Sequence, residues 1–368
     1  MVEIMWRLPV KSLLRFKCVC KNWYSLIQSF TFINDHYNHP NNRTRLLVHY
    51  LQKEYHTSQF TLFSDETLTN TIAEDIVNPL TRRNVCFHNI MGPVNGLFLV
   101  NYGQLALWNP ATTEFRQLPL PTSDVPPIDS VFGFSFGFGF DPLTGDFKVV
   151  RIPYSGNDRL LVQLYSLGSD SWRRINSASL VHILRNGGFF WRRGWDNMYL
   201  NGAYYWLSLT RPTIILFDMR REVFREIQTP PSFRKELSTN YNQDCQLLLY
   251  NNSIALLETR YANAILLDSI HVWYLMIKGE EYCWTKHSIV RLPLIPEFRF
   301  LGFWMNGEIL LYKHKKYTYH SRVSKLVFYN PNNLKILDLG TRWKSIEVLN
   351  YKASLASVKG GRKLCQTS

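Results

Sequence analysis

After residue 40, the chain repeats an aromatic signature about every 55 residues. In each copy, an apolar or aromatic residue ends a strand-like run and is followed by a polar turn. In four of the five copies a second bulky residue stands seven positions later, and in the fifth a longer loop reaches Trp284. The anchor residues are separated by 57, 52, 56 and 56 residues, and they are Trp108, Tyr165, Phe217, Trp273 and Tyr329. A period of this length predicts one supersecondary unit that is used several times.

A tight turn between two apolar runs precedes each anchor. The five turns are Asn95-Gly96, Gly145-Asp146, Asn201-Gly202, Asn251-Asn252 and Asn306-Gly307. Asparagine and glycine tolerate the positive φ angles that two-residue hairpins demand, and the runs beside the turns suit strands. Two hairpins in each period make four strands, which is the unit of a kelch-like propeller blade.

The number of repeats predicts the architecture. Five units are clear between about residues 90 and 340, and we expect the runs at 45–77 and 346–358 to complete a sixth blade that joins the two ends of the chain. The predicted fold is mainly β with a small N-terminal α-helical hairpin, built as a kelch-like β-propeller of about six four-stranded blades. Aromatic residues, 15% of the chain, supply the contacts between blades. An open or stacked β-sandwich would show similar turn spacing, but it would not need so regular a period.

Glycine alternates with phenylalanine from Gly133 to Phe140. A dinucleotide fingerprint would need G-x-G-x-x-G at the start of a helix, whereas this run continues into the turn 141–145. The alternation instead predicts a strand that packs tightly against a neighbouring sheet.

The net charge of +14 favours polyanionic partners, so nucleic-acid binding is a hypothesis to weigh. The densest basic groups lie far apart in sequence and belong to no recognisable nucleic-acid-binding motif; they are Arg192-Arg193, Arg220-Arg221 and Lys313 to Lys316. Scattered basic residues are typical of solvated strand edges and loops. We therefore expect no specific nucleic-acid partner, and only weak, salt-sensitive binding.

The sequence contains no recognisable motif for catalysis or metal binding. The six cysteines show no C-x-x-C spacing, His314 and His320 lack metal-site spacing, and there is no G-x-S-x-G motif. We expect no catalytic, cofactor-binding or metal-binding residues, and hence no cofactor. The sequence has no run of eighteen apolar residues and no signal-peptide order at its start. We therefore expect no membrane association and an intracellular protein, cytoplasmic, nuclear or both.

The N-terminal stretch predicts a helix with one apolar stripe. Ser12 is a candidate helix cap, and apolar residues then recur at three- and four-residue steps over about four turns, at Leu13, Phe16, Val19 or Cys20, Trp23 and Ile27. Taken alone, such a stripe usually indicates a helix that packs on its own domain.

Two groups of motifs resemble a known family. Leu8 to Leu13 (LPVKSL), the following Leu-Arg-Phe step, and Trp23 with Leu26-Ile27 resemble an F-box. Four later segments resemble the plant F-box-associated domain of type one, as found in S-locus-like F-box proteins: Leu107 to Pro119 (LWNPATTEFRQLP), Phe136 to Ile152 (FGFGFDPLTGDFKVVRI), Asn201 to Leu207 (NGAYYWL) and Ile215 to Ile227 (ILFDMRREVFREI). Together the two resemblances cover nearly the whole chain.

The resemblance implies a domain order and a set of partner contacts. It implies an F-box at 1–40, a β-propeller-like domain at 41–358 and a tail at 359–368. Family members usually carry an acidic start and most of a first helix before the position of Val2, so we expect the F-box to be truncated at its N-terminus. In the family this hairpin docks on a Skp-type adaptor of a cullin ubiquitin ligase, and the residues that resemble adaptor contacts are Leu8, Pro9, Leu13, Leu14, Phe16, Val19, Trp23, Leu26 and Ile27.

The resemblance also implies a function. We expect a non-catalytic substrate-recognition subunit of an SCF-type (Skp-cullin-F-box) E3 ubiquitin ligase, whose β-domain binds a target protein that the sequence does not identify. Rim loops at 121–131, 176–196 and 228–244 are candidates for target contacts, and they are equally well explained as tolerant insertions. Two alternatives remain open at this point: a ligase-independent interaction scaffold, and a basic nucleic-acid-associated protein.

Overall fold

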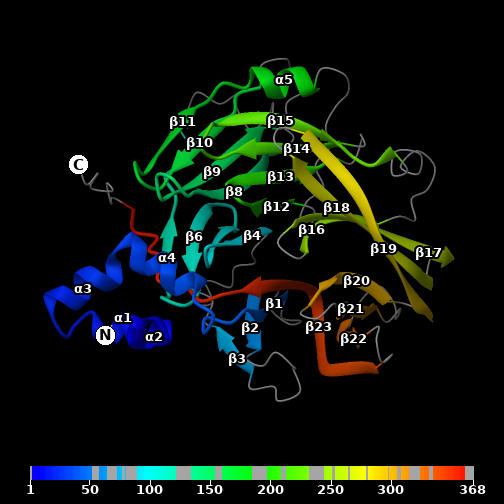
Figure 1. Ribbon diagram of the computed structural model, residues 1–368, viewed down its shortest axis with the longest axis horizontal. Coiled ribbons are helices and arrows are strands. Elements are labelled where there is room, and N and C mark those ends of the chain that lie inside the picture. Colours follow the sequence, from blue (N-terminus) through cyan, green and yellow to red (C-terminus); the bar gives the residue numbers. More distant parts are fainter. Residues whose placement is uncertain are drawn as a thin grey trace.

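Six four-stranded antiparallel sheets, the blades, are arranged in a ring in the computed structural model, with N-terminal helices against one side (Figure 1). The structure describes residues 2–51, 58–63, 73–76, 79, 89–121, 134–153, 160–184, 197–208, 213–231, 244–250, 253–263, 266–278, 281–296, 298–304, 308–314, 324–330 and 335–360. This architecture confirms the predicted propeller and excludes the β-sandwich.

The blades follow one another along the chain, apart from one shared strand. Blades 1 to 3 contain β1 (Arg45–Leu51), β2 (Ser58–Phe63) and β3 (Ala73–Ile76); β4 (Asn89–Val94), β5 (Leu97–Asn101), β6 (Leu105–Asn109) and β7 (Glu114–Gln117); and β8 (Phe134–Asp141), β9 (Asp146–Pro153), β10 (Gln163–Ser166) and β11 (Ser171–Arg174). Blades 4 to 6 contain β12 (Asn197–Leu200), β13 (Ala203–Leu207), β14 (Thr213–Asp218) and β15 (Val223–Gln228); β16 (Asp244–Tyr250), β17 (Ser253–Asn263), β18 (Leu266–Lys278) and β19 (Glu281–Pro296); and β20 (Phe298–Phe303), β21 (Ile309–His314), β22 (Ser324–Asn330) and β23 (Lys335–Tyr351).

The long strand β23 closes the ring. Its first part pairs with β22 in blade 6. Its last part, Lys344 to Tyr351, pairs antiparallel with β1 and takes the first position in blade 1, the position that β4 has in blade 2. Successive blades also touch, through β4 with β8, β8 with β12, β12 with β16, β18 with β20, β20 with β23 and β23 with β4. The prediction that the two ends of the chain complete a sixth blade is confirmed.

All five anchors occupy the third strand of their blades, β6, β10, β14, β18 and β22. In four blades the bulky residue seven positions later is the cross-strand partner on the fourth strand, and the pairs are Trp108 with Phe115, Tyr165 with Trp172, Phe217 with Phe224 and Tyr329 with Ile336. Blade 5 departs from this register, because the ladder is irregular between Val272 and Trp273 and Trp284 pairs with Leu275. The aromatic signature is therefore a cross-strand pair repeated around the ring.

The predicted turns join the first and second strands of the blades. Asn95 and Gly96 have φ of 47° and 81°, and Asn201 and Gly202 have φ of 47° and 83°. Positive φ at both central residues defines the two-residue hairpin turn that matches strand twist. Gly145 ends a longer turn with φ 67°. The turns at 251–252 and 306–307 lie outside the described residues.

The glycine-phenylalanine run forms β8, and its glycines face blade 4. A Cβ atom on Gly137 would lie 2.5 Å from Cζ2 of Trp206, and one on Gly139 would lie 2.8 Å from Cδ2 of Tyr199. Both aromatic residues also bond the backbone of β8: Trp206 Nε1 donates to the carbonyl of Phe136 at 3.1 Å, and the Tyr199 hydroxyl donates to the carbonyl of Phe140 at 2.7 Å. The predicted tight packing between sheets is confirmed.

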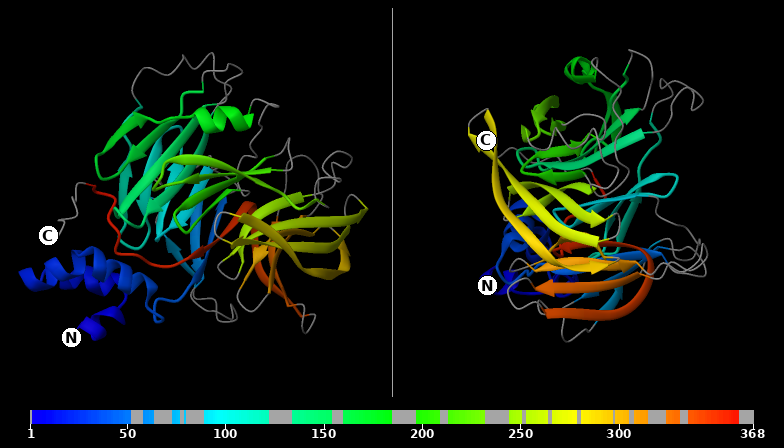
Figure 2. Two further views of the ribbon diagram at one scale, coloured as in Figure 1. Left: turned by 45° about the horizontal axis from the view of Figure 1, so that its top comes forward. Right: turned by 90° about the vertical axis from the view of Figure 1, so that its right-hand side faces the viewer.

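The antiparallel order gives the ring two different rims. One rim, the hairpin rim, carries the turns between strands one and two and between strands three and four of each blade. The other, the loop rim, carries the connections between strands two and three and between blades. Arg45 pairs with Tyr351, so the chain enters and leaves the ring at the hairpin rim. The N-terminal helices consequently lie on the opposite side from α5 (Ala178–Leu184), which belongs to the loop rim (Figure 2).

Candidate functional site

Short helices form the N-terminal helical unit, residues 2–38, and they are α1 (Val2–Trp6), α2 (Val10–Phe16), α3 (Lys21–Gln28) and α4 (Phe30–Asn38). Helix α2 begins after Pro9, so Ser12 lies in its first turn and the prediction of a Ser12 cap is wrong. The predicted N-terminal helical hairpin is confirmed, but the apolar stripe does not lie on one continuous helix of about four turns. Cys20 is extended, with φ −159° and ψ 164°, and its Sγ accepts a hydrogen bond from Trp23 N at 3.5 Å, so a second helix starts there.

The nine residues that resemble adaptor contacts divide into two groups. Leu13 and Ile27 have no exposed surface and pack inside the chain, where they hold α2 and α3 to the core. The other seven are exposed or half-buried, and they are Leu8, Pro9, Leu14, Phe16, Val19, Trp23 and Leu26. Phe16 and Trp23 meet edge to face with ring centroids 5.3 Å apart, which joins α2 to α3. Five of the seven also pack against the core with part of their surface, whereas Pro9 and Val19 are exposed.

Sequence reasoning missed several exposed apolar residues of this unit, and Ile4 and Tyr24 are the most exposed of them. Ile4 is 67% exposed and Tyr24 is 49% exposed, values comparable with the 61% of Val19. The five-residue helix α1 is too short to show a period, and Tyr24 falls off the stripe that contains Trp23. We define the F-box surface as the seven exposed or half-buried residues above together with Ile4 and Tyr24.

Helix α4 ties this unit together. Ser29 caps α4 by accepting a hydrogen bond from Phe32 N at 3.2 Å, and Phe32 and His36 are both buried. His36 Nε2 lies 2.9 Å from the carbonyl oxygen of Leu8. Burial lowers the pKa of His36, and the bond to Leu8 opposes that effect only in part. A neutral imidazole that donates its Nε2–H to Leu8 fits this geometry.

The same helix rests on the hairpin rim of the propeller. The ring of Phe30 stacks on Phe140 at the end of β8, with centroids 6.2 Å apart and planes 19° apart. Tyr37 bonds the backbone of Gly96 in the first hairpin turn, and burial raises the pKa of Tyr37 to about 12. Ile33 packs against both hydrophobic clusters that border the junction. Helix α4 is thus shared between the helical unit and blades 2 and 3.

A buried segment at the end of the chain fills the rest of this junction. We call residues 352–360 the C-terminal strap. Leu355 is buried in one cluster with Phe32 of α4, while Val358 is buried in the cluster between blades 2 and 3. Asn42, in the linker after α4, donates from Nδ2 to the carbonyl of Ala353 at 2.9 Å. We expected 346–358 to supply closing strands, but the strand ends at Tyr351, because its partner β1 begins at Arg45 opposite it.

Asn109 receives the middle of the strap. Its Nδ2 donates to the carbonyls of Ser354 and Ala356 at 3.0 and 2.7 Å, while its Oδ1 accepts the backbone N–H of Ala111 at 3.0 Å. The side chain is fully buried. One amide therefore both shapes the turn after β6 and binds the strap. In blade 4 the corresponding residue is Asp218, whose carboxylate accepts two backbone N–H groups in the same way.

The strap continues across blade 2 to blade 3. Val358 N donates to Glu114 Oε2 at 3.0 Å, and Arg116 donates to the carbonyls of Val358 and Lys359. Gly360, with φ 64°, passes beside the carbonyl of Leu167 in the turn after β10. Side chains from blades 2 and 3 and from the linker after α4 therefore hold a single peptide segment.

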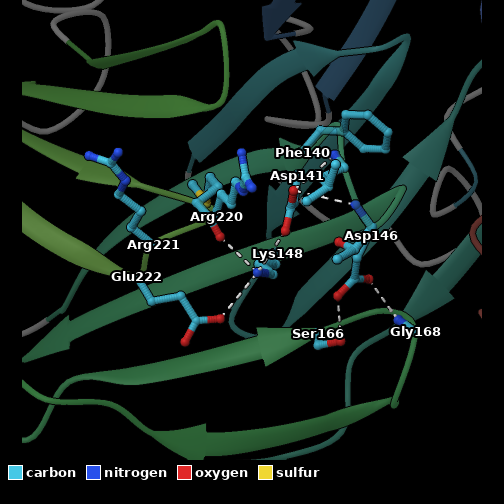
Figure 3. Close-up of polar contacts among 12 residues, drawn as sticks. Phe140, Asp141, Asp146, Lys148, Ser166, Gly168, Arg220, Arg221 and Glu222 are labelled. Carbon is cyan, nitrogen blue, oxygen red and sulfur yellow. Dashed lines mark hydrogen bonds and ion pairs between the residues drawn. The ribbon is translucent and has the colours of Figure 1, made fainter.

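A polar clamp joins blades 3 and 4 at the same rim (Figure 3). Lys148 Nζ lies 3.3 Å from Asp141 Oδ2 and 3.1 Å from Glu222 Oε1, and it donates to the carbonyl of Met219 at 2.7 Å. Burial alone would raise the pKa of Asp141, but the hydrogen bonds from Thr144 and the backbone and the charge of Lys148 lower it below its usual value. All charges of this clamp have partners, which indicates a structural role.

The loop rim holds the candidate target loops. Residues 122–131, 185–196 and 232–243 of those loops lie outside the described residues. In the remaining part, Ala178 to Leu184 form α5, whose Leu180 and Ile183 are buried against blades 3 and 4. This portion of the 176–196 segment is therefore packed structure.

Metal sites and membrane-spanning helices are both absent from the part of the chain that the structure describes. Within it, no three His, Cys, Asp or Glu residues come together as a metal site would require. None of the helices described there is long and apolar enough to span a membrane.

Comparisons with known proteins match both parts of the chain. The F-box associated beta propeller domain family matches residues 45–352, and the F-box domain family matches residues 1–35. An F-box/kelch-repeat protein of Arabidopsis thaliana is 28% identical over 311 residues, which cover 81% of this chain and 79% of the relative. F-box protein CPR1 of the same plant is 26% identical over 373 residues, covering 95% and 83% of the two chains. The chain therefore belongs to the F-box-associated β-propeller family, as a plant-type F-box protein.

Proposed function

We propose that this chain is the substrate-recognition subunit of an SCF-type ubiquitin ligase. The F-box surface recruits a Skp-type adaptor and, through it, a cullin, and the loop rim of the propeller holds a target protein. The chain catalyses no reaction itself and acts inside the cell, in the cytoplasm, the nucleus or both. The family membership supports the first part of this proposal, and the arrangement of the two rims supports the second.

The observation that carries the proposal is the placement of the F-box surface. Helix α4 and the C-terminal strap fix the helical unit on the hairpin rim, with Phe30 on Phe140 and Asn42 on Ala353. In the described part of the chain, neither the helical unit nor the strap covers the loop rim on the other side of the ring, and we assign the target protein to that rim. A receptor needs two such surfaces that do not compete for space.

The mechanism follows from this rigid spacing. A target held at the loop rim stays at a set distance from an adaptor held at the F-box surface, so a lysine of the target meets the ligase-bound ubiquitin donor at high effective concentration. The chain contributes binding and orientation. The junction contributes by limiting how far the two surfaces can move apart.

Binding of a purified Skp-type adaptor tests the proposal. Val19 is 61% exposed within the F-box surface, so a Val19→Glu variant places a charge against the adaptor without disturbing the core. Desolvating an unpaired carboxylate in an apolar contact should weaken binding by about tenfold or more. The matched control is Leu120→Glu, which makes the same kind of change at a residue that is 78% exposed on the other rim.

The outcomes separate the receptor from a scaffold. We expect the wild type and Leu120→Glu to bind the adaptor equally and Val19→Glu to bind poorly, with all three showing the same circular dichroism and unfolding midpoint. If the folded wild type binds no adaptor, the receptor proposal fails and a ligase-independent scaffold takes its place. Equal binding by all three proteins would contradict the placement of the adaptor on the F-box surface.

A further inference from the structure

Arg151 lies near the loop-rim end of β9, in blade 3. Its cross-strand neighbours are Phe136 on β8 and Gln163 on β10. Alternation along β9 places it on the same face as Val149, which is buried in the cluster between blades 2 and 3. Arg151 therefore stands at the loop-rim end of the seam between these blades, beside the strand that follows the candidate target loop at 121–131.

Two neighbours hold the guanidinium group of Arg151 in place. Its central carbon lies 3.6 Å from the ring centroid of Phe134, which is a cation–π contact. Its Nη1 donates to Oε1 of Gln163 at 2.8 Å, and Gln163 is only 2% exposed. An aromatic ring and a buried amide thus orient one arginine side chain at the rim.

No carboxylate pairs with Arg151 among the residues that the structure describes. Two arginines on the hairpin rim do have carboxylate partners: Arg116 pairs with Asp170, and Arg173 pairs with Glu222. Burial lowers the pKa of Arg151 to about 10, so the group is still protonated at neutral pH. A guanidinium has five N–H donors, and the bond to Gln163 uses one of them. A partly buried cation with spare donors is favourable for binding an anion.

We propose that Arg151 is an anion anchor on the loop rim, which binds a carboxylate or phosphate group of the protein that the propeller holds. This inference rests on the receptor function proposed above. The planar fork of an arginine matches both groups, because each presents two oxygen acceptors side by side. A protein partner is favoured over a nucleic acid, because one oriented cation neutralises a single charge, whereas nucleic-acid binding requires several basic side chains along a backbone.

A degenerate peptide library tests the anchor on the full chain. Each pool fixes one central residue between randomised flanks, and the acidic pools with Asp, Glu or phosphoserine are compared with the neutral pools with Asn, Gln or serine. We expect the wild type to retain at least one acidic pool about tenfold better than its neutral counterpart. The Asp and Glu pools report on a carboxylate, and the phosphoserine pool reports on a phosphate.

Three variants make the test specific. Arg151→Gln should lose the preference for the acidic pool, and Arg151→Lys should keep only part of it, because lysine retains the charge without the planar fork. Arg220→Gln removes the same charge from an exposed residue on the hairpin rim and should behave as the wild type. Thermal unfolding of all variants checks the fold.

Several results would overturn the inference. The wild type would show no acidic preference, or Arg151→Gln would keep it. Binding of a single-stranded oligonucleotide that depends on Arg151 at physiological salt, without any peptide preference, would replace the protein partner by a nucleic acid. Adaptor binding is measured separately on the same samples, so failure of the receptor proposal is distinguishable from failure of the anchor.

Discussion

The two rims of the propeller differ in what their turns are required to do. At the hairpin rim the turns have set shapes, with positive φ at Asn95, Gly96, Asn201 and Gly202, and the chain's own α4 and strap pack on this rim at blades 2 and 3. At the loop rim the connections have unequal lengths, and one of them contains α5. A rim that packs against its own chain must keep its geometry, whereas surface connections without that constraint are free to vary in length.

Removing the strap should destabilise the hairpin rim more than any other change proposed below. A chain that ends at Tyr351 loses Leu355 and Val358, and the burial of these and the smaller strap residues contributes about 5 kcal/mol to the free energy of unfolding. We expect a much lower unfolding midpoint and fast hydrogen exchange in α4. A chain that ends at Gly360 is the control and should match the full chain. Unchanged exchange in α4 without the strap would contradict its role.

A smaller loss of stability is expected when only Asn109, which binds the strap, is altered. Asn109→Asp keeps the oxygen that shapes the turn but removes the two donated hydrogen bonds and turns a carboxylate toward two carbonyls, at a cost of about 3 kcal/mol. The matched variant in blade 4 is Asp218→Asn, where an oxygen acceptor suffices, and it should cost less than about 1 kcal/mol. Denaturant unfolding measures both. Equal losses would show that Asn109 serves only its own turn.

A change at the contact between blades 3 and 4, away from the strap, should destabilise the protein by less than the change at Asn109. Gly137→Ala places a methyl group 2.5 Å from the ring of Trp206 and should cost about 2 kcal/mol. Gly302→Ala is the control, because nothing lies within 4 Å of the added atom. Hydrogen exchange in α4 should stay slow in both variants, since the junction is untouched. Faster exchange in α4 of Gly137→Ala would contradict the independence of the two contacts.

Lowering the pH should have the smallest effect on stability, through His36 in α4 at the hairpin rim. Burial lowers the pKa of His36 in the folded protein, so its imidazole stays neutral just below pH 6.5. In the unfolded chain the same imidazole protonates around pH 6.5. The unfolded state therefore binds more protons in this range. The free energy of unfolding should fall as the pH drops from about 6.5 to the lowered pKa of His36 and then stop changing through this group. His36→Gln removes this contribution, so the difference between the two pH profiles isolates it from the other histidines. Parallel profiles would show that burial does not perturb His36.

Most of the ring could be predicted from the sequence, because local rules place its parts. Asn-Gly turns demand positive φ, and Trp108 with Phe115 or Phe217 with Phe224 span a turn of constant length. The alternation of glycine and phenylalanine indicates close packing, although its partner Trp206 lies about 70 residues further along the chain. Each of these features depends on a few neighbouring residues.

The candidate sites could be predicted only in part. The apolar stripe does not locate the break between α2 and α3, since Cys20 is an unusual cap for a helix. Leu13 and Ile27 lie on the same apolar stripe as the other predicted contact residues, so the sequence does not distinguish them. The structure shows that they face inward, in one buried cluster with Phe32 of α4. The strap was expected to continue as a strand, because its partners Asn42 and Asn109 lie more than 200 residues away in the chain. Distant pairings of this kind leave no local pattern.

The closure of blade 1 by Lys344 to Tyr351 has a consequence for synthesis on the ribosome. Strand β1 emerges early, but its partner follows about 300 residues later, which corresponds to a wait of roughly 15 to 60 s at usual translation rates. The strap that fixes the F-box comes later still. A nascent chain, or one cut short by a premature stop codon, therefore carries the F-box sequence without the seat that orients it. Translation of residues 344–360 is thus the step that fixes the helical unit on the ring.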